Sequence, residues 1–461
     1  MANKIERVPV REQDPKVRAT NFEEVCYGYN EQEAMLEASR CLNCRRPGCM
    51  IACPVSVKIP AFIEKVAAGD FEGAGKIIAM DSSLPAICGR VCPQESQCEG
   101  SCILSMKGQP VAIGKLERFV ADWSTENGIS YSEREAPNGK KVAVVGSGPA
   151  GLACASDLAK WGYEVTIFES LHKPGGVLQY GIPEFRLPKD KVVGVEIAKL
   201  KELGIKIETN VIVGRTITIE QLMQQEGFSA VFVGSGAGLP KFMNIPGESL
   251  NGVFSANEFL TRNNLMKAYS QESDTPIYAG HKAVVVGGGN VAMDAARTAL
   301  RLGAEVTIVY RRTEKELPAR AEEVHHAKEE GIEFRMLSNP VEIIGDEKGW
   351  VRAIRCQQME LGALDASGRR SPVAVEGALF DIETDVVIMS LGTSPNPLIA
   401  GTTPGLEVDR RGCIVATANG ETSKEYVYAG GDAVTGAATV ILAMGAGRKA
   451  AKAIDEKLKG Q

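Results

Sequence analysis

Residues 141–169 read KVAVVGSGPAGLACASDLAKWGYEVTIFE: an apolar run, a glycine-rich turn, a helical stretch and a second apolar run. The glycines of the turn have the spacing G-x-G-x-x-G. A diphosphate must approach bare backbone at a helix N-terminus, where free N–H groups favour anions. Glu169, at the end of the second run, can accept hydrogen bonds from ribose hydroxyls. The stretch therefore predicts a strand, a helix and a strand that bind a dinucleotide. The predicted contacts in the turn are Gly146, Gly148, Pro149, Ala150 and Gly151.

Residues 282–312, KAVVVGGGNVAMDAARTALRLGAEVTIVYRR, have the same pattern with alanine in place of the third glycine. Arg311 occupies the position of the acid, and Arg312 follows it. Arginine pairs with the ribose 2′-phosphate of NADP, whereas an acid would repel it. We expect this site to prefer NADP over NAD; the alternative is a solvated pair of arginines after a strand. The predicted contacts in the turn are Gly287, Gly289, Asn290, Val291 and Ala292.

From residue 140 onward, short β-branched runs alternate with helical segments, which favours doubly wound parallel sheets. The predicted strands are Val142–Val145, Glu164–Phe168, Ala230–Val233, Ala283–Val286, Glu305–Val309 and Val386–Met389. With two glycine-rich turns, the fold class is α/β with two Rossmann-like dinucleotide-binding domains. Before residue 135, Asn30 and Glu33 form a predicted capping box, and residues 60–80 carry apolar side chains at helical spacing. The N-terminal part is therefore expected to contain short helices.

Two dinucleotide sites in one chain imply that electrons pass from one bound dinucleotide to the other. Two segments favour FAD at the first site. Residues 173–182, KPGGVLQYGI, contain Gly175 and Gly176 in a stretch that can approach a flavin ring. VYAGGD at 427–432 puts Asp432 past a strand, where it can bond ribitol or pyrophosphate oxygens; an ordinary strand-to-turn Gly-Gly-Asp is the alternative. The remaining predicted FAD contacts are Gly431, Thr439 and Val440. No side chain is assigned as a catalytic acid or base.

Composition restricts the class of protein. The 461 residues are 44% hydrophobic and 24% charged, which is typical of a globular protein, and their number suggests roughly three domains. A net charge of −6 provides no basic field for nucleic acid. The longest apolar stretches fall far short of the ~20 residues of a membrane span, and the first residues, MANKIERVPVREQ, have no apolar core. We expect a cytoplasmic protein with no membrane or nucleic-acid partner.

Eight of the twelve cysteines fall between Cys41 and Cys102. In a reducing compartment, such density indicates metal ligands rather than disulfides. Zinc would favour two C-x2-C pairs, and only one occurs, whereas the Cys-Pro dipeptides at 53–54 and 92–93 are typical of ferredoxin-like runs. Adjacent flavin and NADP sites also need an electron outlet, so we predict two [4Fe-4S] clusters. Counting alone would divide the eight cysteines into two sets of four.

The motifs GSGPAG, a following P-G-G, a second G-x-G-x-x-A and a late G-G-D resemble those of the flavoprotein reductases with two dinucleotide-binding domains. In that family the NADP domain is inserted into the FAD domain. The resemblance implies an FAD domain in two parts, residues 136–269 and 394–461, and an NADP domain at 270–393. A mainly α-helical iron–sulfur domain, residues 1–135, would precede them. Gly392, at the end of a strand, matches the second crossover and is a predicted NADP contact.

The cysteine-rich zone is similar to the small subunit of NADPH-dependent glutamate synthase and to the matching domain of dihydropyrimidine dehydrogenase. This resemblance implies interleaved ligands, one of them a carboxylate. One cluster would be held by Cys41, Cys44, Cys49 and Cys102, and the other by Cys53, Cys92, Cys98 and Glu117. Cys88 would then be a buried free thiol. The alternative is a solvated carboxylate at Glu117, with Cys88 as the ligand.

Over essentially its whole length the chain resembles the large subunits of NADH-dependent ferredoxin:NADP oxidoreductases, electron-bifurcating transhydrogenases. Phrases such as VYRRTEKELPAR (309–320) and GAATVILAMGAGRKAAKAI (436–454) carry this resemblance. It implies an NADP-dependent flavoprotein oxidoreductase whose partners are ferredoxin and a second flavin and iron–sulfur subunit on the NAD side. The small subunit of glutamate synthase shares every cofactor motif, and its partner is a large subunit. A zinc- and nucleotide-binding scaffold without activity is a further alternative.

Overall fold

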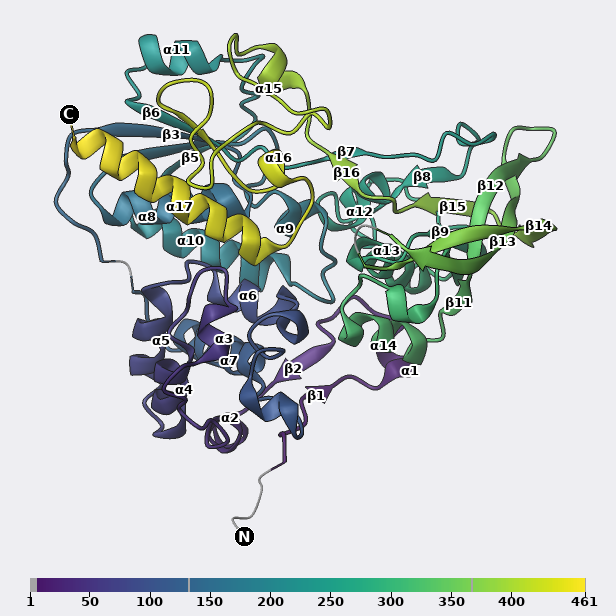
Figure 1. Ribbon diagram of the computed structural model, residues 1–461, viewed down its shortest axis with the longest axis horizontal. Helices are drawn as coiled ribbons and strands as arrows, with labels where there is room; N and C mark the ends of the chain where they lie inside the picture. Colours follow the sequence, from purple (N-terminus) through teal and green to yellow (C-terminus); the bar gives the residue numbers. More distant parts are fainter. Residues whose placement is uncertain (1–5, 132, 366–367, 461) are drawn as a thin grey trace.

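The computed structural model describes residues 6–131, 133–365 and 368–460. Residue 132, near the end of the predicted helical domain, lies outside the described residues, as do residues 366–367 and the ends of the chain at 1–5 and 461. Figure 1 shows a helical N-terminal part (purple), a part built on one sheet and closed by the C-terminal helix (yellow), and a part built on a second sheet (mostly green).

The first sheet has five parallel strands in the order β17-β6-β3-β4-β5. These strands are β3 (Lys141–Val145), β4 (Glu164–Phe168), β5 (Lys206–Glu208), β6 (Ala230–Val233) and β17 (Val427–Ala429). The helices of this part are α8 (Pro149–Lys160), α9 (Val177–Tyr180), α10 (Gly194–Glu202), α11 (Ile219–Gln224), α15 (Leu398–Gly401), α16 (Asp432–Thr435) and α17 (Val440–Lys459). The three strands predicted here are confirmed. Their side chains are mostly buried, as expected for a parallel sheet covered on both faces.

The second sheet also has five parallel strands, in the order β11-β10-β9-β15-β8. These strands are β8 (Val253–Ser255), β9 (Lys282–Val286), β10 (Glu305–Tyr310), β11 (Glu333–Met336) and β15 (Val386–Met389). Its helices are α12 (Ala256–Asn264), α13 (Asn290–Arg301) and α14 (Ala321–Glu329). The predicted strands are again confirmed, but the sheet begins before the expected boundary at 270. The three-residue edge strand β8 pairs with β15, and this pairing is not visible in the apolar pattern.

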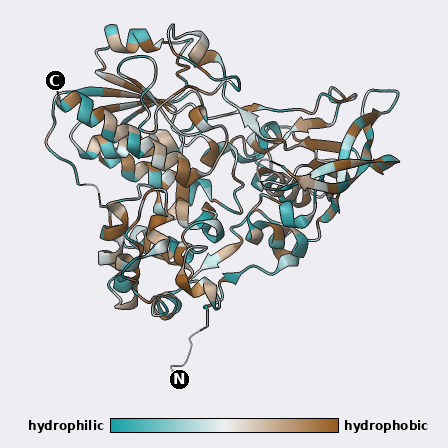
Figure 2. Cartoon of the chain, viewed as in Figure 1, coloured by the Kyte–Doolittle hydropathy of each residue, from teal (hydrophilic) through white to brown (hydrophobic). Residues whose placement is uncertain are grey.

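An antiparallel sheet, not predicted from the sequence, projects from this second part (Figure 1). Its strands are β12 (Ser338–Gly345), β13 (Val351–Leu364) and β14 (Arg370–Glu383). Figure 2 shows teal and brown mixed along this hairpin, whereas the parallel strands are largely brown. A second antiparallel pair, β7 (Leu239–Pro240) with β16 (Thr393–Ser394), connects the two parallel-sheet parts where the chain crosses between them.

The N-terminal part contains short helices, as predicted. They are α1 (Pro15–Arg18), α2 (Glu31–Ala38), α3 (Gly48–Ile51), α4 (Ile59–Ala67), α5 (Phe71–Ala79), α6 (Pro85–Val91) and α7 (Ile113–Glu126), with strands β1 (Arg11–Glu12) and β2 (Cys26–Gly28). The predicted capping box is confirmed: Glu33 N donates to Asn30 Oδ1 at 2.9 Å, and Asn30 N donates to Glu33 Oε2 at 2.8 Å. The chain turns at Gly69 and Asp70 between α4 and α5, and Asp70 caps α5.

The N-terminal part and the first sheet share one hydrophobic core. Phe62 and Leu84 belong to the same group of buried side chains as Leu152 on α8 and Ile454 on α17. The second sheet has separate cores on its two faces. In Figure 1, α17 runs beside α8 on the side that faces the helical part. Of the described helices, α17 included, none is both long enough and apolar enough to cross a bilayer. The shared core shows that apolar burial fixes the cysteine-rich part on the first sheet.

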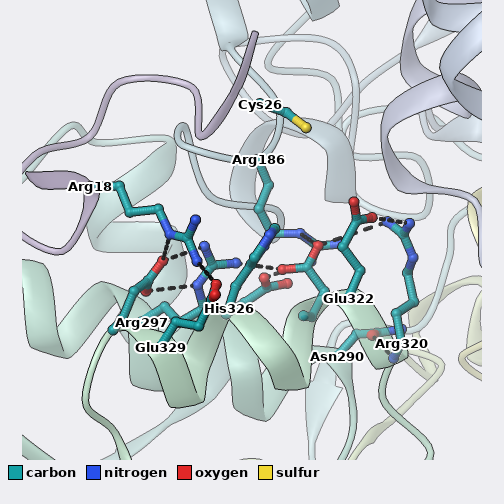
Figure 3. A network of polar contacts seen from close by, with 12 residues as sticks. Arg18, Cys26, Arg186, Asn290, Arg297, Arg320, Glu322, His326 and Glu329 are labelled. Carbon is teal, nitrogen blue, oxygen red and sulfur yellow. Dashed lines mark hydrogen bonds and ion pairs between the residues drawn. The ribbon is translucent and has the colours of Figure 1, made fainter. Parts of the chain in front are cut away.

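Contacts to the second sheet use buried charge instead. Arg18, on α1, pairs with Glu329 at 2.5 Å and Glu330 at 3.1 Å, at the end of α14. Arg186, from the first part, reaches Asp294 on α13 at 2.6 Å. Figure 3 shows Arg18 and Glu329 at one end of this network and Arg186 in its middle. The other end is formed by Asn290, Arg320 and Glu322. Buried arginines and carboxylates are stable only as paired groups, so the network defines one mutual arrangement of the three parts.

Glu330 provides a test of this network. Burial opposes its ionisation, but hydrogen bonds from Arg297 and Arg301 outweigh that effect and lower its pKa from 4.5 to about 2. The ionised form therefore stabilises the fold above about pH 4.5, and the stabilisation is lost as the pH falls toward 2. Glu330→Gln should lower the free energy of unfolding by about 3–5 kcal/mol at pH 7, because it removes the carboxylate that pairs with buried Arg301 and one of the two that pair with buried Arg297. Calorimetry between pH 7 and pH 3 should show this difference shrinking below about pH 4.5.

The matched control is Glu333→Gln, which removes the exposed ion pair of Glu333 with Arg335. Exposed pairs contribute about 0–1 kcal/mol, so this variant should unfold nearly as the unmodified chain does. Equal effects of the two substitutions would contradict a stabilising role for the buried network.

Candidate functional site

The first glycine-rich turn connects β3 to α8 with almost no space for side chains. Gly146 has a φ of +96°, a conformation that favours glycine. A Cβ on Gly151 would lie 2.0 Å from the carbonyl oxygen of Gly146. At Gly148 a Cβ would meet nothing within 4 Å, so the turn is open there toward the start of α8. Compact backbone with an open side at a helix N-terminus fits a diphosphate.

Glu169 organises the turn from the end of β4. Its carboxylate accepts from Ser147 N at 3.0 Å and Ser147 Oγ at 2.5 Å. The other carboxylate oxygen accepts from Leu171 N at 2.8 Å. Ser147 Oγ in turn accepts from Gly175 N at 2.8 Å, so the P-G-G segment is tied to the turn. Glu169 is buried, and its position at the strand end is the one expected for a ribose contact.

The remaining predicted FAD residues converge on the same turn. A Cβ on Gly176 would lie 2.9 Å from Cα of Gly148, and one on Gly431 would lie 2.9 Å from Cβ of Ala150. Asp432 follows, and burial raises its pKa to about 6. Thr439 caps α17, where its hydroxyl accepts from the N–H of the third helical residue. These residues come from both halves of the split first part, and the fold brings them to one edge of the first sheet.

The second turn has a similar construction. Gly287 has a φ of +144°, and a Cβ there would lie 2.4 Å from the carbonyl oxygen of Ser390, at the end of β15. Gly289 has open space around its Cα, and Ala292 is fully buried beneath the turn. Gly392 also has open space and a φ of +89°. The predicted contacts Asn290 and Val291 lie in the first turn of α13, and Val291 is exposed.

The two arginines after β10 differ in position. The side chain of Arg311 is exposed and makes no hydrogen bond or ion pair with the described part of the chain. Arg312 is 5% exposed; it donates to the carbonyl oxygen of Arg370 at 2.8 Å and to Asp365 at 2.7 Å. Successive side chains after a strand point to opposite sides. The hydrogen bonds of Arg312 hold the hairpin, which leaves Arg311 as the exposed cation of the pair. Binding of the 2′-phosphate by either arginine stays a prediction.

The cysteines fall into two groups. In the first group, burial and the neighbouring thiols of Cys102, Cys41 and Cys44 together raise the pKa of Cys49 to about 11, against a hydrogen bond from Met50 N–H. Burial and the thiols of Cys44 and Cys102 also raise the pKa of Cys41. Close thiols whose thiolates would be buried and repel one another need a bound cation to ionise, which iron provides.

The second group surrounds Glu117 on α7. Burial raises the pKa of Cys53, with further contributions from Glu117 and Cys92, against hydrogen bonds from backbone N–H groups. Burial likewise raises the pKa of Cys98, and the same neighbours add to it. Glu117 itself is raised to a pKa of about 8 by burial and by the nearby carboxylate of Glu196. Glu117 is therefore half-buried beside these thiols rather than on a solvated helix face, and its role as a ligand stays a prediction.

Cys88 is also near the second group. It is fully buried, its Sγ lies 3.4 Å from Met444 Sδ on α17, and Cys92 and burial raise its pKa. Among the described residues, no three cysteine Sγ atoms lie within 4.8 Å of one another. Zinc–thiolate bonds of about 2.3 Å would bring tetrahedral ligands to about 3.8 Å, whereas a four-iron cluster separates its thiolates further.

The second cysteine group lies against the helix that completes the FAD cradle. A Cβ on Gly445 of α17 would lie 2.9 Å from the carbonyl oxygen of Pro54, directly after Cys53. Arg448, one turn later, donates to the carbonyl oxygen of Val55 at 3.2 Å. Helix α17 thus lies between the thiols of this group and the turn that fits a dinucleotide, and it contacts both regions.

Residues 140–451 match the sequence model of a family described as pyridine nucleotide-disulphide oxidoreductase. The chain belongs to this family. Residues 18–129 match a second family, described as dihydropyrimidine dehydrogenase domain II, 4Fe-4S cluster. The match to residues 18–129 accounts for the cysteine-rich part, and the match to residues 140–451 accounts for the two dinucleotide turns.

Individual relatives extend over most of the chain. The glutamate synthase [NADPH] small chain of Halomonas elongata is 36% identical over 98% of this chain and 99% of its own length. The NADP(+)-dependent formate dehydrogenase subunit beta of Moorella thermoacetica is 39% identical over 89% of this chain and 60% of its own length. The structure of Mycobacterium tuberculosis FprA in complex with NADPH has a TM-score of 0.59 at 22% identity, over 70% of this chain and 85% of that chain.

These findings confirm the α/β fold class with Rossmann-like sheets after an iron–sulfur domain. They also establish this pyridine nucleotide-disulphide oxidoreductase as an NADP-dependent flavoprotein with FAD and 4Fe-4S cofactors. The sequence did not identify four residues that organise its sites: Ser147, Tyr180, Gln94 and Arg320. Nothing in the pattern marks Ser147 among other hydroxyls. Burial, with Asp432 and Glu169 nearby, raises the pKa of Tyr180 to about 12, which places its phenol beside the FAD residues.

Arg311→Ala should reduce kcat/KM for NADPH about 10- to 100-fold and leave that for NADH nearly unchanged. The expected loss is that of a charge-assisted hydrogen bond to the 2′-phosphate, about 1.5–3 kcal/mol. Steady-state kinetics with both dinucleotides and an artificial electron acceptor measures the ratio.

Arg312→Ala is the matched control, because its side chain holds the hairpin in place. It should change both dinucleotides alike. A selective loss of NADPH use in the Arg312 variant, or an equal loss for both dinucleotides in the Arg311 variant, would contradict this assignment.

Proposed function

We propose that this chain is the NADP(H)-side electron-transfer subunit of a larger oxidoreductase complex. One observation carries the proposal: the second cysteine group packs on α17, through Cys88 with Met444 and Pro54 with Gly445, while the N-terminus of the same helix borders the FAD residues. When bound, FAD accepts a hydride from NADPH and releases single electrons to iron–sulfur clusters. The remaining task of the chain is to hold these groups near one another.

For the clusters, we propose the interleaved ligand sets. Cys41, Cys44, Cys49 and Cys102 would hold one cluster, and Cys53, Cys92, Cys98 and Glu117 the other. The proximities among the thiols support this division: the pKa of Cys49 depends on the first set, and those of Cys53 and Cys98 depend on the second. Sets taken in simple chain order would place Cys53 with Cys49, against these proximities.

Around the dinucleotides, the protein's role is orientation and exclusion of water, which hydride transfer requires more than an acid or base. Glu169 and Asp432 would bind FAD hydroxyls, and the open turn at Gly148 would receive its diphosphate. Arg311 would bind the 2′-phosphate of NADP(H), and Gly289 would receive the diphosphate at the start of α13. The buried charge network keeps the second sheet in place during this transfer.

The first cysteine group is where a partner would receive electrons. Large apolar side chains next to it are exposed to solvent: Leu42 at 63%, Ile51 at 81%, Ile103 at 55% and Met106 at 79%. The segments that carry them meet, because a Cβ on Gly48 would lie 2.7 Å from the carbonyl oxygen of Ser101. Exposed apolar residues gathered at one place are typical of a protein–protein contact. We therefore propose that the partner docks here.

Two complexes are candidates. The chain resembles electron-bifurcating transhydrogenase subunits, which would give it ferredoxin and an NAD-side flavin and iron–sulfur subunit as partners. The second candidate is a glutamate synthase. The similarity to the glutamate synthase [NADPH] small chain of Halomonas elongata supports it, because that similarity covers 99% of the relative's length. In that case the partner is a large glutamate synthase subunit. Both candidates require the same cofactors and the same packing of the cysteine-rich part on α17.

Anaerobic purification of the native complex, with mass spectrometry of the copurifying subunits, distinguishes the two. A large glutaminase-type subunit would establish the glutamate synthase arm, and a smaller flavin and iron–sulfur subunit would establish the bifurcating one. A chain that purifies alone and reduces only small acceptors would contradict the proposal of a subunit.

The ligand assignment predicts different metal contents for two variants. The unmodified chain should hold about eight irons and eight sulfides per flavin, as two four-iron clusters require. Glu117→Ala should lose close to half of the iron, because the second cluster lacks a ligand. Iron and sulfide analysis after anaerobic purification measures this loss, and electron paramagnetic resonance identifies the cluster that is lost.

Cys88→Ala is the matched control, since it removes the neighbouring thiol but no proposed ligand. It should retain both clusters. Loss of iron in the Cys88 variant with full iron in the Glu117 variant would reverse the assignment.

The docking surface predicts a separation of activities. The double variant Ile51→Glu with Met106→Glu should weaken NADPH-driven transfer to the copurifying partner at least tenfold, because charge at the centre of an apolar contact is costly to desolvate. NADPH oxidation with a small artificial acceptor should be unchanged. Leu364→Glu, on the distant hairpin and 70% exposed, is the control and should affect neither. An unimpaired double variant would exclude this surface.

A further inference from the structure

The segment before α14 is bonded to the second dinucleotide turn on both sides of Gly289. Ala319 N donates to the carbonyl oxygen of Gly288 at 3.2 Å. Arg320 N donates to Asn290 Oδ1 at 2.8 Å. The backbone position of Arg320 therefore depends on the conformation of the turn that fits the NADP(H) diphosphate.

The side chain of Arg320 reaches the N-terminal part. Its guanidinium donates to the carbonyl oxygen of Arg90 at 3.0 Å and to Gln94 Oε1 at 3.0 Å. It also pairs with Glu322 at 2.6 Å, and its side chain is 4% exposed. Figure 3 shows Arg320 beside Asn290 and Glu322 at one end of the buried network. One residue thus contacts both the dinucleotide turn and a loop of the cysteine-rich part.

Gln94 determines the shape of that loop, which runs from Cys92 to Cys98. Its side-chain amide donates to the carbonyl oxygens of Gly89 and Cys88 at 3.3 and 3.4 Å. The backbone carbonyl oxygen of Gln94 accepts hydrogen bonds from the N–H groups of three later residues, Gln97, Glu99 and Gly100. Because Gln94 is bonded on both sides of the loop, a shift of Gln94 would move the thiols of Cys92 and Cys98 relative to each other.

We propose that Arg320 is a positioning residue that couples occupancy of the NADP(H) site to the second iron–sulfur cluster. The inference rests on the proposed function, which places a cluster at Cys92 and Cys98. A dinucleotide bound at the start of α13 fixes Asn290 and so holds Arg320. Arg320 then holds Gln94, with a parallel bond from Ala321 N to Glu95 Oε1 at 3.1 Å. The bound nucleotide thereby sets the geometry and the hydrogen bonds around the cluster thiolates, which tune its reduction potential.

Thermodynamic linkage makes the coupling measurable. If NADP+ binds the two redox states of the cluster with different affinity, it changes the equilibrium constant for reduction of the cluster by the ratio of the two affinities, and so shifts its reduction potential. A fivefold difference corresponds to about 40 mV for a one-electron couple. In the unmodified protein, we expect saturating NADP+ to shift the potential of the second cluster by at least this amount in a redox titration followed by electron paramagnetic resonance.

Arg320→Ala should bind NADP+ and retain its cluster signals but lose most of this shift. Arg320→Lys, which keeps one donor and the charge, should restore part of it. Arg335→Ala removes an exposed arginine of the same sheet and should leave the shift intact. A shift of equal size in the unmodified protein and in Arg320→Ala would overturn the inference, as would the absence of a shift in the unmodified protein.

Hydrogen–deuterium exchange of the unmodified protein supplies a second readout that needs no variant. NADP+ should slow the exchange of backbone amides in residues 88–100, and unchanged exchange there would overturn the inference. A protein that lacks clusters or does not bind NADP+ would instead refute the proposed function. Intact cofactors with independent responses would refute only the coupling.

Discussion

The arrangement depends on one helix, α17, which contributes to both the FAD cradle and the seat of the cysteine-rich part. Thr439 begins it beside the FAD residues, and its first turns carry Met444, Gly445 and Gly447. A Cβ on Gly447 would lie 2.1 Å from the carbonyl oxygen of Ala150, in the first dinucleotide turn, and one on Gly445 would lie 2.9 Å from Pro54. Larger residues at these positions would separate the thiols from the turn. Under the proposed function, the transfer of electrons within the chain depends on this close backbone packing at one helix.

Buried charge, rather than a shared apolar core, holds the second sheet in place. Its own cores are separate. Buried ion pairs of Arg18 and Arg186 and buried hydrogen bonds of Arg320 join it to the other parts. Charged pairs withdrawn from water favour one geometry more than they add stability, because each unpaired arrangement leaves a charge desolvated. Apolar burial thus fixes the cysteine-rich part against the first sheet, and paired charge fixes the second sheet against both.

Local patterns predicted much of this fold. The glycine turns, the apolar strands around them and the capping box at Asn30 follow from a few adjacent residues, so the sequence could reveal them. The edge strand β8 could not be recognised, because three residues are too few to show a repeating pattern of apolar side chains. The orientation of Arg312 depends on the β13–β14 hairpin, which the sequence did not predict. Arg320 and Gln94 lie 226 residues apart, and no local period indicates such a contact.

The central claim is that electrons from NADPH reach the iron–sulfur clusters through this chain alone. Anaerobic mixing of the purified protein with excess NADPH, followed by freezing and electron paramagnetic resonance, tests it directly, with dithionite-reduced protein as the reference for total cluster. The account predicts that flavin absorbance is lost and that a reduced-cluster signal appears on addition of NADPH alone. Flavin reduction with no cluster signal, in protein whose clusters dithionite reduces, would contradict it.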